Sequence, residues 1–137
     1  MRTIKFRAWH KQEKQMYHPQ YLHFSPDGEL FGILVKEGQL LAIDDFELMW
    51  FIGVKDKHGD EVYEDDVIKL GVGAAYDPIL FRVVWDENQL KYMARQIDHK
   101  EELMINIMHF QHDIEIQGNI YEHPQLARPD WWRQGGE

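Results

Sequence analysis

The sequence lacks cysteine and is very poor in serine, and both shortages exclude whole classes of chemistry. Without cysteine, the chain has no disulfide scaffold, cysteine nucleophile, thiolate zinc site or iron–sulfur centre. Ser25 is the only serine, and it lies in a Ser-Pro-Asp-Gly turn rather than in the Gly-x-Ser-x-Gly motif of a serine hydrolase. Gly71-Val72-Gly73 lacks the third glycine and the Lys–Ser/Thr ending of a phosphate-binding loop. These motifs therefore give no catalytic or cofactor-binding site.

Long apolar runs are also absent. No segment approaches the roughly 20 apolar residues that a membrane-spanning helix needs. The first nine residues contain Arg2, Lys5 and Arg7, where a secretion signal requires an apolar stretch. We therefore expect a cytoplasmic protein that has no contact with membranes.

What the sequence does contain is a short, acidic and aromatic-rich chain. Of its 137 residues, 28% are charged and 13% are aromatic, and 15 Lys and Arg against 24 Asp and Glu give a formal net charge of −9. A chain of this length fits one domain and buries roughly two-thirds of its unfolded surface. Because no linker or repeat interrupts it, we predict a single domain over residues 1–137, with residues 128–137 as a C-terminal tail.

The charge is unevenly distributed. Residues 1–20 hold five basic side chains and one acid, a local net charge of +4, and residues 21–137 carry −13. Such asymmetry favours contact with a polyanion or head-to-tail pairing between copies of the chain. The simpler interpretation is an edge strand that Lys and Arg protect from unwanted pairing.

Short apolar segments separated by turn residues predict a mainly β protein with antiparallel strands. We expect strands near residues 4–9, 21–24, 29–35, 48–54, 67–70, 79–85, 90–94 and 114–121, with a bulge at Gly118. Residues 48–54 are apolar throughout, which predicts a strand covered by the core on one face and by another subunit on the other. Residues 71–78 read as a loop. Residues 96–110 fit one short helix or a strand equally well.

Acidic and histidine clusters invite a metal-site interpretation that their spacing does not support. His109 and His112 are three residues apart, and they would face opposite sides of a strand. Adjacent acids such as Asp44-Asp45 and those of residues 64–66 also point apart on a strand, and the chain has no calcium-loop pattern. Turn and cap roles, in which Asp side chains accept hydrogen bonds from nearby backbone N–H groups, explain the acids better. We therefore assign no catalytic, cofactor-binding or metal-binding residue, and we expect a non-enzymatic protein without a cofactor.

Three blocks of the sequence carry a resemblance to a known family. They are residues 4–9 (IKFRAW) with Met16-Tyr17, residues 48–68 (LMWFIGVKDKHGDEVYEDDVI) and residues 114–126 (IEIQGNIYEHPQL). Their order and spacing resemble the YopX family of bacteriophage and prophage proteins over nearly the whole chain. The resemblance implies a mainly β fold, phage origin, a bacterial host cell and self-association into a homo-oligomer. It implies no established activity and no catalytic residues.

The chain departs from this family at a few positions. The family usually has Asn at the position of His58, a smaller polar residue near Ile52, and Gly at the position of Asp65. The missing glycine weighs against a left-handed turn at position 65, although Asp tolerates positive φ better than most residues. Residues 61–70 read as a polar turn that feeds a strand, as at the start of small SH3-like barrels. By this fold-level analogy we expect a YopX-like fold with a small SH3-like barrel-type core.

The first functional hypothesis is a non-enzymatic phage accessory protein that forms a homo-oligomer and binds a phage or host protein. Its candidate interface residues come from the continuous apolar block and from the tail. They are Met49, Trp50, Phe51, Trp131 and Trp132. Apolar and aromatic side chains of this kind form the centres of protein interfaces.

The alternative hypothesis is a small β-barrel that binds single-stranded nucleic acid through its basic N-terminal strand. Its candidate contacts are Lys5, Arg7, Lys11 and Lys14 on phosphates, with Trp9 stacking on a base. The negative net charge disfavours this alternative, because phosphate neutralisation needs a positive surface.

Overall fold

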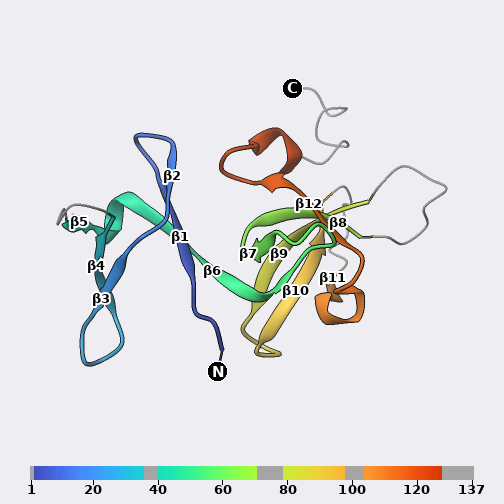
Figure 1. Ribbon diagram of the computed structural model, residues 1–137, viewed down its shortest axis with the longest axis horizontal. Helices are drawn as coiled ribbons and strands as arrows, with labels where there is room; N and C mark the ends of the chain where they lie inside the picture. Colours follow the sequence, from blue (N-terminus) through green and yellow to red (C-terminus); the bar gives the residue numbers. More distant parts are fainter. Residues whose placement is uncertain (1, 36–39, 71–78, 98–103, 128–137) are drawn as a thin grey trace. The chain divides into compact units, whose positions relative to one another are not determined.

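The computed structural model describes residues 2–35, 40–70, 79–97 and 104–127. Regular structure within these ranges is mainly β (Figure 1), which confirms the predicted fold class. The strands are β1 (Phe6–His10), β2 (Gln15–Tyr17), β3 (Tyr21–Phe24), β4 (Leu30–Leu34), β5 (Leu40–Ala42), β6 (Phe46–Lys55), β7 (Glu61–Tyr63), β8 (Asp66–Leu70), β9 (Leu80–Asp86), β10 (Lys91–Gln96), β11 (Met104–Asn106) and β12 (Ile114–Asn119). Three short 3₁₀ helices accompany them in the described ranges: η1 (Ile43–Asp45), η2 (Ile107–Phe110) and η3 (Pro124–Ala127).

The chain forms two compact units. Residues 4–50 form the N-terminal unit, and residues 1–3 together with 51–137 form the C-terminal unit. Strand β6 contributes to both, since its first half pairs with β1 and its second half with β7. The prediction of a single domain over residues 1–137 stays a prediction.

The N-terminal unit is built from hairpins. Strand β1 pairs antiparallel with β2 and with β6, and β4 lies between β3 and β5 in a three-stranded sheet. The hairpin between β3 and β4 turns at Ser25–Gly28, where Gly28 takes a φ of +88° and donates its N–H to the Ser25 carbonyl. This confirms the turn that Pro and Gly predict. The buried core of the unit consists of Ala8, Ile33, Val35 and Phe46.

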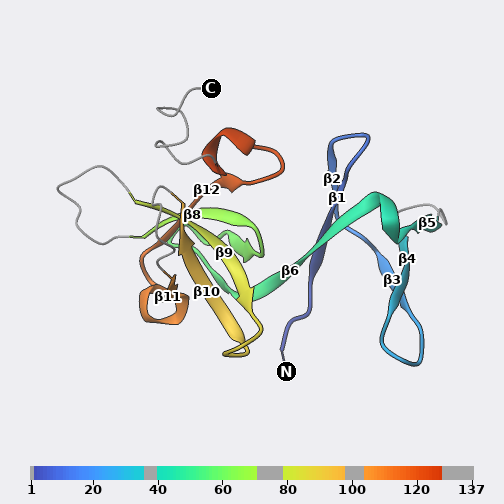
Figure 2. The same cartoon turned by 180° about the vertical axis from the view of Figure 1, so that it is seen from behind.

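The C-terminal unit contains a curled antiparallel sheet in the order β11-β10-β9-β8-β12 (Figures 1 and 2). Its buried core draws on several strands and on η2, and consists of Val62, Ile68, Leu70, Phe81, Val83, Ala94, Ile107 and Ile114. β-Branched and aromatic side chains dominate this cluster, which is the composition that suits a pleated, buried surface. The curled sheet agrees with the barrel-type core expected from the sequence.

The structure tests three of the sequence expectations for the C-terminal unit, and a fourth concerns residues that it does not describe. Of the ambiguous stretch 96–110, the structure describes residues 96–97 and 104–110. These contain the end of β10, the short strand β11 and the 3₁₀ helix η2, so the helical part within them is a single turn. The register between β12 and β8 shifts between Ile116 and Gly118, which confirms the bulge. Asp65 takes a left-handed φ of +69° in the turn between β7 and β8. The left-handed turn is therefore present at position 65, although the replacement of the family's glycine by Asp weighed against it. The predicted loop 71–78 lies outside the described residues.

The turn between β6 and β7 is organised by one buried carboxylate. Asp56 Oδ1 accepts hydrogen bonds from the backbone N–H groups of His58 and Asp60, each at 2.9 Å. Its Oδ2 accepts a third, at 3.1 Å, from the backbone N–H of Ile116 in β12. Burial raises the pKa of Asp56, but the three N–H donors and the charge of His58 together lower it by more, so the pKa lies below its ordinary value. Asp56 thus ties the turn to β12, across 60 residues of sequence.

Candidate functional site

The apolar block in β6 is unevenly buried within the chain. Met49 is completely buried, whereas Trp50 is 40% exposed and packs edge-to-face on Phe6 with ring centroids 4.6 Å apart. Phe51 is half-buried and lies beside Tyr63. Of the candidate interface residues in this block, Trp50 has the largest exposed fraction. Trp131 and Trp132 lie outside the described residues.

The basic residues of the N-terminal strand do not form one exposed surface. Arg7 is buried, and its Nε donates to Met49 Sδ at 3.3 Å. Lys11 pairs with Glu47 at 3.4 Å and donates to a backbone carbonyl at 3.2 Å. Lys5 and Lys14 are exposed, and Trp9 is half-buried. The candidate phosphate contacts are therefore divided between buried, paired and exposed side chains.

Several exposed aromatic side chains lie on the hairpin of β3 and β4, which the sequence analysis did not single out. Tyr21 is 64% exposed, Phe31 56% and Phe24 46%. The His23 and Phe31 rings meet edge-to-face with centroids 5.9 Å apart. Phe31 is the extra residue where the register shifts between His23 and Phe24, so the bulge turns it outward. We call Tyr21, His23, Phe24 and Phe31 the aromatic hairpin.

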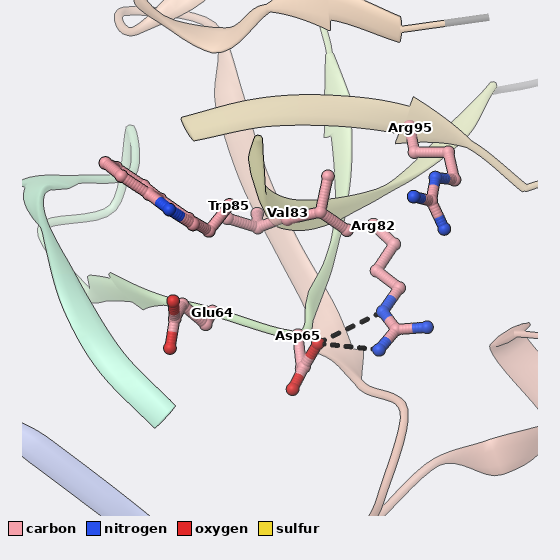
Figure 3. A pocket seen from close by; sticks show the side chains of 7 residues that line it. Glu64, Asp65, Arg82, Val83, Trp85 and Arg95 are labelled. Atoms are coloured by element: carbon pink, nitrogen blue, oxygen red, sulfur yellow. Dashed lines mark hydrogen bonds and ion pairs between the residues drawn. The ribbon is translucent and has the colours of Figure 1, made fainter. Parts of the chain in front are cut away.

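A second feature, in the C-terminal unit, is a polar pocket of about 270 Å³. Figure 3 shows Asp65 and Arg82 joined across its centre, with Arg95 on one side and Glu64 below Trp85 on the other. Asp65 Oδ1 accepts from Arg82 Nη2 at 2.8 Å and from Arg82 Nε at 3.1 Å. Asp65 makes these contacts from the left-handed turn between β7 and β8.

The side of the pocket near Trp85 is acidic and aromatic. Trp85 and Tyr92 are neighbours on β9 and β10 in direct register, and their rings meet edge-to-face at 5.0 Å. The pKa of Tyr92 is raised to about 12, mainly by burial and further by the charge of Glu64 and its hydrogen bond with the phenol. Arg2 lowers the pKa of Tyr92 by a smaller amount. The Tyr92 hydroxyl therefore stays protonated and available to Glu64 at neutral pH.

The described residues do not assemble a metal site or a familiar catalytic group. No cluster of three or more His, Asp or Glu side chains within those ranges could hold a metal ion. The acids of residues 64–66 serve the fold: Asp66 Oδ2 accepts from the Tyr63 backbone N–H at 2.8 Å, and Asp65 pairs with Arg82. Across the same ranges, no helix has the length and apolar character needed to cross a bilayer.

Comparisons with known proteins place the chain in a family. The family model described as YopX protein matches residues 5–127. Protein EF1440 from Enterococcus faecalis has a similar crystal structure, with a TM-score of 0.71 and 19% identity over 93% of this chain and 100% of that chain. The crystal structure of protein yopX from Bacillus subtilis is also similar, with a TM-score of 0.62 and 18% identity over 92% of this chain and 98% of that chain. No curated protein sequence matches the chain. Since the family model covers most of its length and the fold agrees, this chain belongs to the YopX protein family.

Proposed function

We propose that the protein is a non-enzymatic phage or prophage accessory protein that self-associates in the cytoplasm of a bacterial host and binds another protein. The observation that carries this proposal is the aromatic hairpin, in which Tyr21, Phe24 and Phe31 are exposed on adjoining strands. The family resemblance supports phage origin and self-association.

The aromatic hairpin has the chemistry of a protein interface. Aromatic side chains offer large contact areas with few rotatable bonds, and they are enriched at the energetic centres of interfaces. Strand β3 is also an edge of its three-stranded sheet. Its sequence, YLHF, has neither the Lys nor the Pro that commonly protects an edge strand. An added strand from another molecule would pair with this edge and cover the rings.

The contact between copies is expected to be heterologous, that is, formed by different surfaces of the two molecules. The excess of positive charge in residues 1–20 and of negative charge in residues 21–137 makes such a head-to-tail contact electrostatically favourable. Exposed Trp50 supplies a further aromatic side chain in the same unit.

Sedimentation velocity of three proteins tests this proposal. We expect the unmodified chain to associate at micromolar concentration, and the double variant Tyr21→Ser/Phe31→Ser to weaken association by at least about tenfold, because two buried aromatic contacts are lost. Met108→Ser is the matched control, since Met108 is an exposed apolar residue of the C-terminal unit. An unmodified chain that stays monomeric at every salt concentration would contradict the proposal. So would a double variant that associates as strongly as the control.

Binding of single-stranded nucleic acid is the alternative, and it is supported less well. Arg7 is buried and Lys11 is paired with Glu47, which leaves fewer cations for phosphates. The alternative predicts oligonucleotide binding that weakens steeply with salt. It also predicts that Lys5→Glu reduces binding, so an affinity that Lys5→Glu leaves unchanged would eliminate it.

A further inference from the structure

Arg95 is a half-buried cation, and the folded chain provides no hydrogen-bond acceptor for its Nε donor. Its Nε is inaccessible to solvent and has no hydrogen-bond partner. Unpaired buried donors are rare in native proteins, and a bound water or ion commonly supplies the missing acceptor. Arg95 lines the same pocket as Arg82, and an acceptor bound in that pocket would meet its guanidinium group.

The two arginines also lie opposite each other in the sheet. Arg95 on β10 pairs in register with Arg82 on β9, which places both side chains on one face. Like charges in this arrangement repel unless an anion lies between them. Asp65 forms an ion pair with Arg82 at 2.8 Å. Among the described residues, no ion pair of this kind is found for Arg95.

We propose that this pocket binds an oxyanion, a carboxylate or phosphate group, whose oxygens accept hydrogen bonds from the guanidinium groups of Arg95 and Arg82. The planar fork of Arg matches both kinds of oxyanion. The proposal concerns the C-terminal unit and does not depend on self-association through the aromatic hairpin.

The pocket has the space and the polarity that such a ligand needs. Its volume of about 270 Å³ is several times the ~30 Å³ that one water molecule occupies in the liquid. Glu64 lies on the side away from Arg95 (Figure 3), where it interacts with Tyr92. The anionic group therefore docks at the arginine side, and the acidic and aromatic side takes the uncharged or cationic part of a larger ligand.

Nuclear magnetic resonance of the Arg Nε–Hε groups tests the proposal on the full chain. The protein is titrated separately with inorganic phosphate and with acetate at constant ionic strength, with chloride as the reference anion. We expect a saturable shift of the Arg95 Nε–Hε signal with at least one of the two probes. The stronger probe identifies the kind of oxyanion that the site prefers.

Three variants separate a built site from general charge attraction. Arg95→Gln lacks the Arg95 signal, so its affinity is read from the Nε–Hε signal of Arg82 in the same pocket. This variant should weaken binding at least about tenfold, as expected for loss of a charge-assisted hydrogen bond. Lys55→Gln, which removes one exposed charge of the same unit, should leave affinity unchanged. Asp65→Asn should strengthen binding about threefold to tenfold, because it removes the Asp65 carboxylate that competes with the ligand for Arg82. Asn still tolerates the left-handed backbone at this position.

The outcomes are distinguishable. A saturable shift that depends on Arg95 and grows in Asp65→Asn supports the oxyanion site. A shift that stays linear in probe concentration, or that Lys55→Gln weakens as much as Arg95→Gln, means an adventitious ion only and overturns the proposal. Chemical shifts of the remaining amides report whether each variant is folded, so a misfolded Arg95→Gln is replaced by Arg95→Lys. That variant keeps the charge but loses the Nε donor, and it should also bind more weakly.

Discussion

Replacing Asp56 by Ala should destabilise the protein by about 3–5 kcal/mol. The change removes the acceptor of three backbone N–H groups, those of His58, Asp60 and Ile116. Leaving a buried donor unpaired costs about 1–3 kcal/mol. We place the total in the lower half of the summed range because turn N–H groups regain some water. A typical domain has only about 5–15 kcal/mol of stability, so the variant should be close to unfolding.

Urea denaturation of Asp56→Ala and two comparison variants provides the assay. Asp56→Asn keeps one carbonyl oxygen and should lose about 1–2 kcal/mol, which corresponds to the bond to Ile116. Asp60→Ala removes an exposed side chain of the same turn and should change stability by less than about 0.5 kcal/mol. If Asp56→Ala unfolds within about 1 kcal/mol of the unmodified chain, the reasoning about this carboxylate is refuted.

The same carboxylate makes the free energy of unfolding decrease at acid pH. The pKa of Asp56 in the folded protein lies below its ordinary value of 3.8. Its contribution is therefore fully present above the pKa of the unfolded chain and is lost as the pH falls through the lower folded pKa. Asp56→Asn should lack this part of the pH dependence.

Three further perturbations follow from the structure. Gly118→Ala should cost about 1–3 kcal/mol by overpacking, because a Cβ there would lie 2.5 Å from His123 Nδ1; thermal unfolding measures it, and an unchanged midpoint would contradict the contact. Asp65→Val should cost about 2–3 kcal/mol through its left-handed φ and the lost ion pair, whereas Asp65→Asn should stay within about 1 kcal/mol, both read from urea midpoints. Glu64→Gln should lower the pKa of Tyr92 from about 12 toward that of a free tyrosine, as followed by alkaline ultraviolet titration with Tyr92→Phe as the reference. Because that folded pKa is raised, the stability it contributes is lost as the pH rises from 10 toward 12, and a titration that Glu64→Gln leaves unaltered would remove Glu64 as a cause.

Local features of the fold were predictable from sequence because neighbouring residues determine them. The turn at Ser25–Gly28 follows from Pro and Gly chemistry, and the bulge at Gly118 follows from a glycine inside a strand pattern. The expectation that adjacent acids serve turns is met at Asp66, which accepts a backbone N–H three residues away.

The pocket could not be predicted, since it depends on pairings between distant segments. Asp65 and Arg82 are 17 residues apart, and Arg95 joins them only through the register of β9 and β10. Nothing in one sequence specifies that register. The left-handed φ at Asp65 had a signal, the family's glycine at that position, but Asp in its place argued in the other direction.

The burial of Arg7 was also inaccessible to pattern reasoning. Alternation along the first strand assigns basic side chains to an exposed face. In the structure, the Arg7 side chain is buried and donates to Met49 on the neighbouring strand. Long basic side chains can cover apolar surface in this way, which binary patterns of polar and apolar residues do not represent.

Light scattering of the unmodified chain tests the central claim most directly. The chain has a mass of 16.5 kDa, and self-association predicts a molar mass that is a multiple of this value at micromolar concentration and falls on dilution. A head-to-tail contact between oppositely charged regions further predicts that added salt reduces the mass. A constant mass of one chain over the whole concentration and salt range would contradict the account.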